Sequence, residues 1–104
     1  MDDDSIFRAL ADPTRRAIFE RLAEGEANAS ALRQGMTISQ PAMSQHLSAL
    51  VGAGLVRQER AGRFVNYGVD PGGMARLARW MGRYRAYWPG RMADLETVLK
   101  EMDQ

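Results

Sequence analysis

Cysteine is absent from this 104-residue sequence, and histidine occurs only once. Without cysteine the chain has no disulfide framework and no thiolate metal ligand, which fits a reducing cytoplasm. No stretch approaches the roughly 18 consecutive apolar residues of a membrane span. The acidic start Met1-Asp2-Asp3-Asp4 is also unlike the basic start of a secretory signal. We therefore expect a cytoplasmic protein that makes no contact with a membrane.

The residue types that enzymes use are also scarce. The sequence contains no glycine-rich phosphate loop and no clustered pair of acids suited to a cleft, and its lone histidine has no second histidine or cysteine to share a metal. We expect no catalytic residue, no cofactor and no metal site. The protein is predicted not to be an enzyme.

Charge is distributed unevenly along the chain, although the net charge is only +1. Residues 1–26 carry four arginines against seven acids, whereas residues 27–91 carry nine arginines against two acids, Glu59 and Asp70. Residues 92–104 are acidic again, with Lys100 against four acids. A basic middle between acidic ends is typical of a chain that meets an anionic partner through its middle. The alternative is that the arginines only solvate helix surfaces.

The length and a hydrophobic share of 45% fit one globular domain over residues 1–104. Apolar spacing, capping residues and glycine stops predict four helices, near residues 5–10, 13–25, 29–34 and 39–53. Two strand-like segments within 55–69 flank Gly62 and predict a β-hairpin, or wing. After a break at 70–73, the pattern is helical over 73–102, with a break or kink at Pro89-Gly90. We predict a mainly α fold with a small β-hairpin, in the order α-α-α-α-β-β-α-α, a winged helix-turn-helix.

The helix at 39–53 has two distinct faces. Its core-facing stripe contains Met43, Leu47, Leu50 and Val51. The opposite row contains Pro41, Ser44, Gln45 and Ser48 and continues to Gly52, without a charge or a large apolar group. Exposed helix faces usually carry Glu and Lys for solubility, whereas short neutral side chains suit close approach to base edges in a major groove. This pattern predicts a DNA-reading helix, and the N–H groups near Ser39 and Gln40 at its start suit a phosphate.

His46 lies at the edge of the core-facing stripe, beside Leu50. A histidine in this place is expected to be partly buried and to pack the helix. A direct contact with DNA is the alternative.

Three arginines, Arg57, Arg60 and Arg63, lie on the predicted hairpin. A two-stranded ribbon with arginines near its tip can follow the phosphate backbone or insert Arg63 into a minor groove. The alternative is a hairpin made basic only for solubility. Tyr67 alternates with Val65 and Val69 on one face of the return strand, so we expect it to pack rather than to bind.

Four aromatic residues, Trp80, Tyr84, Tyr87 and Trp88, follow one sector of the penultimate helix beside Leu77 and Met81. A domain of this size has little interior for four large rings. We therefore predict a dimer interface. A small-ligand pocket between two subunits is the alternative.

Two segments of the chain resemble the ArsR family of winged-helix repressors. Residues 9–18, Ala-Leu-Ala-Asp-Pro-Thr-Arg-Arg-Ala-Ile, resemble the opening helix pair of that family. Residues 39–47, Ser-Gln-Pro-Ala-Met-Ser-Gln-His-Leu, followed by Leu50 and Ala53-Gly54-Leu55-Val56, resemble its recognition helix and the start of its wing. The resemblance implies that Ser39, Gln40, Ser44, Gln45 and His46 approach DNA.

The same resemblance implies repression from an inverted-repeat operator by a homodimer formed through the first and last helices. On the first helix and the two C-terminal helices we expect the interface residues Ile6, Phe7, Leu10, Leu77, Trp80, Met81, Tyr84, Tyr87, Trp88, Leu95 and Leu99.

The chain departs from the metal-sensing members of that family. Those members place cysteines on the helix before the recognition helix, or histidines and carboxylates on the last helix. Here residues 29–32 are Ala-Ser-Ala-Leu, and no histidine follows His46. Soft and borderline metals need several sulfur or nitrogen ligands, so we predict a regulator that does not respond to a metal.

These features together predict a sequence-specific, DNA-binding transcriptional regulator that acts on double-stranded DNA as a homodimer. The alternative is a winged-helix module that binds another protein. That alternative predicts acidic or apolar residues on the Pro41, Ser44, Gln45 and Ser48 row, which the sequence does not contain. The sequence assigns neither the operator nor the small-molecule or protein effector.

Overall fold

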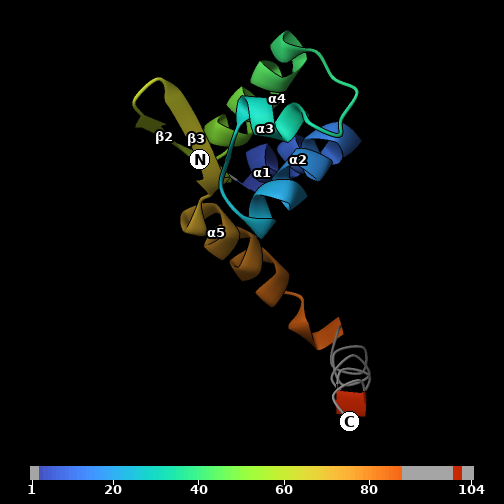
Figure 1. The fold of residues 1–104 in the computed structure, drawn as a ribbon. Coiled ribbons are helices and arrows are strands. Elements are labelled where there is room, and N and C mark those ends of the chain that lie inside the picture. Colours follow the sequence, from blue (N-terminus) through green and yellow to red (C-terminus); the bar gives the residue numbers. More distant parts are fainter. Residues whose placement is uncertain (1–2, 88–99, 102–104) are drawn as a thin grey trace.

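A computed structural model describes residues 3–87 and 100–101 and confirms a winged helix-turn-helix. Four helices form a packed body, the β-hairpin extends along one side of it, and the last described helix leads away from it (Figure 1). The elements in chain order are α1 (Asp3–Ala11), α2 (Pro13–Glu24), β1 (Ala27–Asn28), α3 (Ala29–Arg33), α4 (Gln40–Gly52), β2 (Val56–Ala61), β3 (Phe64–Val69), α5 (Pro71–Gly82) and the 3₁₀ turn η1 (Arg85–Tyr87).

Polar caps decide where four of these helices begin. In each case a side-chain oxygen in the residue before the helix accepts a backbone N–H of the first turn. The donor-to-acceptor distances lie between 2.8 and 3.2 Å, for Asp12 with Arg15, Asn28 with Ala31, Ser39 with Ala42 and Asp70 with Gly72. The sequence predicts only a break at 70–73, whereas the structure shows that this segment is the cap and first turn of α5. Pro71 suits the first position of the helix, because a backbone N–H there would have no partner within the helix.

The sheet contains one strand more than the sequence predicts. β1 pairs antiparallel with β3, so the strand order is β1-β3-β2. β1 is only two residues long and has no alternating pattern of its own. Its residue Ala27 pairs with Tyr67, about 40 residues away in the chain. The predicted hairpin is present, with Ala61 opposite Phe64 and a two-residue turn. Gly62 at φ 62° starts that turn, a conformation that costs glycine little.

One hydrophobic core joins α1, α2, α3, α4 and the start of β2. Met43, Leu47 and Leu50 are at most 1% exposed, as their spacing on α4 predicts. Val51 is only half-buried, at the margin of the same core. The core's buried hydrophobic residues are Ile6, Ala9, Ile18, Phe19, Leu22, Ala27, Leu32, Met43, Leu47, Leu50, Ala53, Leu55 and Val56. In the described part of the chain, no helix is long and apolar enough to cross a bilayer.

The penultimate helix ends earlier than the sequence predicts. α5 stops at Gly82, seven residues before Pro89, and the chain tightens into 3₁₀ geometry. The N–H groups of Arg83 and Tyr84 bond to the carbonyls of Trp80 and Met81, three residues back rather than four. Glycine at position 82 favours such an end because it stabilises a helix less than other residues do. The helix predicted beyond Pro89 lies outside the described residues, apart from positions 100 and 101.

Gly73 fixes how α5 leaves the helical body. A Cβ atom at this position would lie 2.2 Å from the carbonyl oxygen of Gly54 and 2.9 Å from the Cα of Leu55. The first turn of α5 therefore rests directly on the backbone that joins α4 to β2. Only a residue without a side chain permits this approach.

Replacement of Gly73 by alanine should strain this contact. We expect Gly73→Ala to lower the free energy of unfolding by about 1–3 kcal/mol, the usual cost of overpacking. Gly82→Ala is the matched control, because a Cβ there meets no atom within 4 Å. Urea unfolding of both variants checks this prediction, and a Gly73→Ala protein as stable as the original would contradict it.

Asp12 makes stability depend on pH. The hydrogen bond from the backbone N–H of Arg15 is the largest cause that lowers the pKa of Asp12. Partial desolvation raises the pKa, and the nearby side chains of His46 and Arg15 lower it further. A carboxylate with a lowered pKa in the folded state contributes stability above its ordinary pKa. That contribution is lost as the pH falls through the lowered pKa.

Asp12→Asn keeps a capping oxygen but removes the charge. We expect the variant to be less stable than the original protein at pH 7, and the difference to shrink as the pH falls below about 4. Urea unfolding of both proteins over a pH series checks this. A difference that is independent of pH would show that the charge of Asp12 contributes nothing.

Candidate nucleic-acid interface

The predicted reading face of α4 is fully on the surface. Its members Pro41, Ser44, Gln45, Ser48 and Gly52 are all exposed, whereas the other side of the helix enters the core. Among the described residues the surface along this row carries no charged side chain from α4, because the helix contains no acid, arginine or lysine. The helix therefore presents hydroxyl and amide groups to a partner at close range.

The start of α4 offers less to a phosphate than the sequence suggests. The hydroxyl of Ser39 already accepts the N–H of Ala42 at 3.2 Å, and the carbonyl of Ser39 accepts the N–H of Met43 at 3.0 Å. Pro41 has no N–H. Of the first-turn amides, the N–H of Gln40 is the one left to face a phosphate.

His46 is half-buried at the margin of the core, as predicted. Its Nδ1 accepts a hydrogen bond from Nε of Arg15 at 3.4 Å, which joins α4 to the first turn of α2. Because Nδ1 accepts, the proton of the neutral ring is on Nε2. His46 therefore positions α4 against α2, and its side chain lies beside the exposed row rather than within it.

The wing arginines do not form one cluster. Side chains alternate along a strand, so Arg57 and Arg60 point to opposite faces of the hairpin. Arg57 pairs with Glu26 at 3.0 Å, whereas Arg60 and Arg63 are exposed near the tip. Arg60 shares its face with Tyr67, which packs against the core as predicted.

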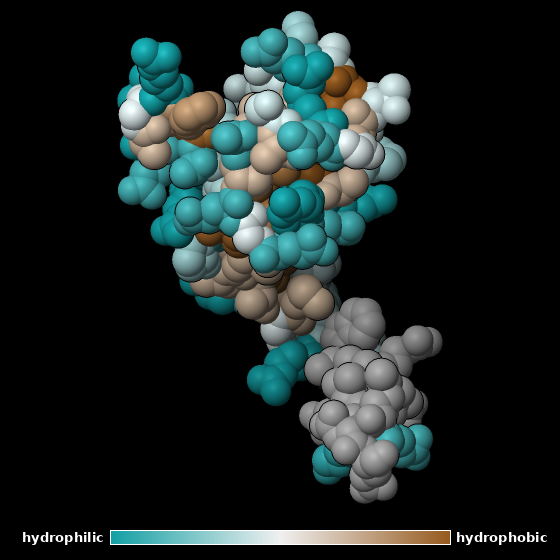
Figure 2. Space-filling model, viewed as in Figure 1, coloured by the Kyte–Doolittle hydropathy of each residue, from teal (hydrophilic) through white to brown (hydrophobic). Residues whose placement is uncertain are grey.

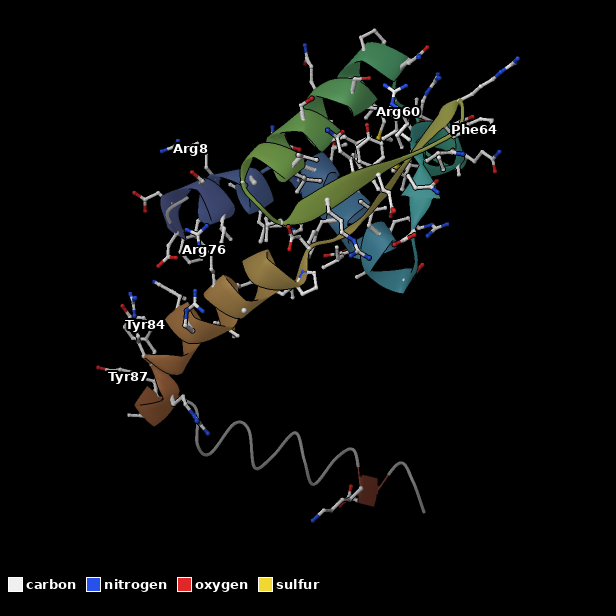
Figure 3. The ribbon with its side chains drawn as sticks, turned by 90° about the vertical axis from the view of Figure 1, so that its left-hand side faces the viewer. Arg8, Arg60, Phe64, Arg76, Tyr84 and Tyr87 are labelled. Carbon is white, nitrogen blue, oxygen red and sulfur yellow. The ribbon has the colours of Figure 1, made fainter. Side chains whose placement is uncertain are left out.

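Phe64 is an exposed residue that the sequence interpretation missed. It is 60% exposed at the tip of the hairpin, near Arg60 (Figure 3). The hairpin register pairs it with Ala61, beyond the end of the core.

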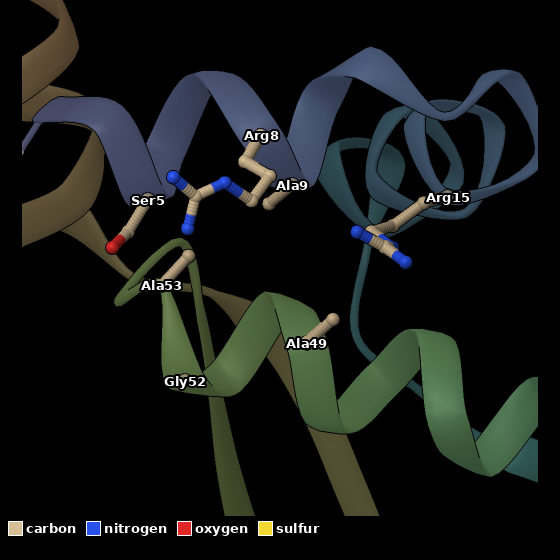
Figure 4. A pocket seen from close by; sticks show the side chains of 7 residues that line it. All are labelled: Ser5, Arg8, Ala9, Arg15, Ala49, Gly52 and Ala53. Atoms are coloured by element: carbon tan, nitrogen blue, oxygen red, sulfur yellow. The ribbon is translucent and has the colours of Figure 1, made fainter.

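Two further arginines lie beside α4, and the charge pattern along the sequence did not indicate them. Arg8 of α1 and Arg15 of α2 line a cleft whose floor is formed by Ala49, Gly52 and Ala53 (Figure 4). Both belong to residues 1–26, a segment with a net negative charge. A count along the chain assigns them to an acidic region, whereas the fold places them beside α4.

The aromatic residues of α5 pack partly against α1. The rings of Phe7 and Trp80 are 4.7 Å apart edge to face, and those of Trp80 and Tyr84 are 5.0 Å apart. Asp3 adds ion pairs at 3.9 Å to Arg76 and Arg83. The first helix and α5 therefore form one unit, which we call the α1–α5 pair.

The α1–α5 pair leaves part of its apolar surface uncovered. Apolar side chains gather over α5 at the lower end of the body (Figure 2). Exposed members are Met74 at 39%, Met81 at 50%, Tyr84 at 42% and Tyr87 at 80%. Phe7, Leu10, Leu77 and Trp80 are half-buried within the protomer.

The prediction is wrong for one of the expected interface residues. Ile6 is 1% exposed and belongs to the core of its own protomer, because α1 turns this side inward. Trp88, Leu95 and Leu99, also predicted at the interface, lie outside the described residues.

Comparisons with known proteins agree with this geometry. A sequence model for a helix-turn-helix domain matches residues 10–59. The HTH-type transcriptional regulator Rv2034 of Mycobacterium tuberculosis is 44% identical over 81 residues, which span 78% of this chain and 76% of that protein. The transcriptional repressor SdpR of Bacillus subtilis is 32% identical over 78 residues, spanning 75% of this chain and 87% of that protein.

Solved structures share the fold. An ArsR-like transcriptional regulator from Rhodococcus sp. RHA1 superposes with a TM-score of 0.71 at 33% identity, covering 91% of this chain and 90% of that one. NolR from Sinorhizobium fredii superposes with a TM-score of 0.62 at 30% identity, covering 78% of this chain and 82% of that one.

Proposed function

Because the chain belongs to the ArsR family of winged helix-turn-helix transcriptional regulators, we propose that it represses transcription by occupying an inverted-repeat operator as a homodimer. DNA binding and transcriptional regulation follow from the family and its helix-turn-helix. The operator symmetry, the dimer and the roles of single residues are the proposal.

The exposed neutral row of α4 is the observation that carries the proposal. Its side chains are short, and the helix has no charge that would need a counterion on entering a groove. In a major groove the amide of Gln45 can pair with an adenine, and the hydroxyls of Ser44 and Ser48 can pair with several base edges. The row therefore suits the reading of bases rather than the binding of phosphates.

The wing supplies the contacts that do not depend on sequence. Arg60 is exposed and lies opposite Val65 in the hairpin register, and Arg63 is exposed in the turn. Arg57 is engaged by Glu26, although a pair this exposed holds it only weakly. We assign Arg60 and Arg63 to phosphates or to the edge of a minor groove, and give Arg57 a lesser part.

The α1–α5 pair supports a homodimer. Met81, Tyr84 and Tyr87 are large apolar or aromatic side chains exposed to solvent, whereas most other large hydrophobic residues that the structure describes are buried or half-buried. A second copy that covers this surface with its own would bury both sets by symmetry. Two α4 helices then reach half-sites about one helical turn apart, roughly 34–36 Å.

We also propose that the signal that releases the DNA is not a metal ion. A relative named the probable mercury resistance operon repressor of Streptomyces lividans is 44% identical over 67 residues, which cover 54% of that protein. This sequence has no cysteine, and Nδ1 of its single histidine is hydrogen-bonded to Arg15. It lacks the several sulfur or nitrogen ligands that a soft metal needs.

Gln45 and Arg63 should affect DNA binding in different ways. An operator selected from random duplexes provides the specific DNA, and a scrambled duplex the reference. We expect Gln45→Ala to relax the preference at one or two operator positions, at a cost of about 1–3 kcal/mol against the specific duplex only. Arg63→Ala should weaken binding to both duplexes and lower the salt slope by about one for each contact removed.

Salt titrations of binding, followed by fluorescence anisotropy, distinguish these effects, and each variant is the control for the other. If Gln45→Ala weakened both duplexes equally and left the base preference unchanged, α4 would not be the reading element.

The dimer has its own test. Met81→Glu places a charge in the proposed interface, on a side chain that is already 50% exposed in the protomer and so tolerates it without unfolding. We expect the original chain to elute at twice its 11.6 kDa mass and the variant at the mass of one chain. Ala75→Glu, exposed on another side of α5, should stay dimeric. Light scattering after size-exclusion chromatography decides, and a dimeric Met81→Glu protein would place the interface elsewhere.

A further inference from the structure

The cleft between α1 and α4 brings together two guanidinium groups from different helices. Arg8 comes from the second turn of α1 and Arg15 from the first turn of α2, and both side chains point into the gap above α4 (Figure 4). Ser5 and Ala9 complete the wall on the α1 side. The floor consists of Ala49, Gly52 and Ala53, whose small side chains leave the gap open.

In the described part of the chain, neither guanidinium group of the cleft takes part in an ion pair. No acidic side chain is among its lining residues. Asp12 uses its carboxylate to accept the backbone N–H of Arg15 at the start of α2. Asp4, one turn before Arg8 on α1, is exposed. Nε of Arg15 donates a hydrogen bond to His46, so the two terminal amino groups of Arg15 can donate to another acceptor. Within residues 3–87, no ion pair involves Arg8, which is exposed.

The size of the cleft suits a small anion. Its volume is about 190 Å³. Pockets for drug-sized ligands occupy roughly 300–1,000 Å³, so the cleft is too small for an organic effector but has room for one phosphate group and a few waters. Two arginines can bind the oxygens of a phosphate through paired N–H groups, a geometry that lysine does not offer.

The cleft adjoins the reading row of α4. Gly52 belongs to both, because it follows Ser48 by four residues and Gln45 by seven. Ala49 follows Gln45 by four residues and so lies beside it on the helix. A helix inserted in a major groove has a phosphate backbone along each flank. We expect the wing arginines to contact one flank and the cleft to face the other.

We propose that Arg8 and Arg15 form a phosphate-binding site in this cleft, and that a backbone phosphate of the operator is its occupant. The inference rests on the proposed function and deepens it. It adds a second anchor that fixes the rotation of α4 in the groove, on the side away from the wing. Free inorganic phosphate has the same chemistry and is the other possible source.

The DNA arm of the test compares Arg8→Gln and Arg15→Gln with Arg21→Gln, an exposed arginine on α2 outside the cleft. Binding is measured from about 50 to 200 mM salt, with specific and scrambled duplexes. For a homodimer we expect each cleft variant to lower the salt slope by about one to two and to weaken both duplexes, because each lost phosphate contact removes about 0.9 from the slope. Arg21→Gln should keep the original slope.

Arg8→Gln is the decisive variant. Among residues 3–87 the Arg8 side chain has no hydrogen bond or ion pair whose loss would disturb the fold, whereas Arg15 holds His46. Thermal unfolding confirms that each variant is folded. Arg8→Lys, which keeps the charge, should recover most of the slope. A slope for Arg8→Gln equal to that of the original protein, with base preference intact, overturns this site and leaves the proposed function standing.

The second arm titrates the free protein with inorganic phosphate and follows the arginine Nε signals by NMR. If the original protein bound no DNA, the proposed function would fail, and the phosphate titration alone would then show whether Arg8 and Arg15 bind an anion. Shifts of the Arg8 and Arg15 signals that are absent in Arg8→Gln would then support a site for free phosphate. Unshifted signals would overturn it.

Discussion

Burial of Met43, Leu47 and Leu50 sets the rotation of α4 about its own axis, and the surface that this protein offers to DNA depends on that rotation. These three side chains are at most 1% exposed and pack beneath α2 and the start of β2. A turn of α4 by one residue would bring Ser44 or Ser48 into the core without a hydrogen-bond partner, which is costly. The core therefore holds the neutral row outward, and Gly73 and the cap at Ser39 limit movement at the two ends of the helix.

The fold places charges side by side that are far apart in the sequence. Arg8 and Arg15 belong to the acidic first quarter of the chain, yet they flank α4 because α1 and α2 pack on it. Arg57 belongs to the basic middle, yet it faces Glu26 and has part of its charge compensated. The arginines that we propose for phosphate contacts therefore come from two parts of the fold, Arg8 and Arg15 from the first two helices and Arg60 and Arg63 from the wing.

Local features were predictable from the sequence, and features that join distant segments were not. The caps at Asp12 and Ser39, the two faces of α4 and the glycine turn of the hairpin each depend on a few neighbouring residues, and the structure confirms them. β1, the inward position of Ile6, the contact at Gly73 and the Arg8–Arg15 cleft all depend on partners more than five residues away. Phe64 was missed for a related reason, since its exposure follows from where the core ends and not from its own strand.

In the function proposed above, the Ser44, Gln45 and Ser48 row reads base edges while arginines hold phosphates. Backbone amide shifts, mapped by NMR during titration with a selected operator and with a scrambled duplex of equal length, distinguish the two kinds of contact. We expect the amides of α4 along this row to shift differently with the two duplexes, and those near Arg60 and Arg63 to shift alike with both. Equal shifts along α4 with both duplexes, or none at all, would contradict this expectation.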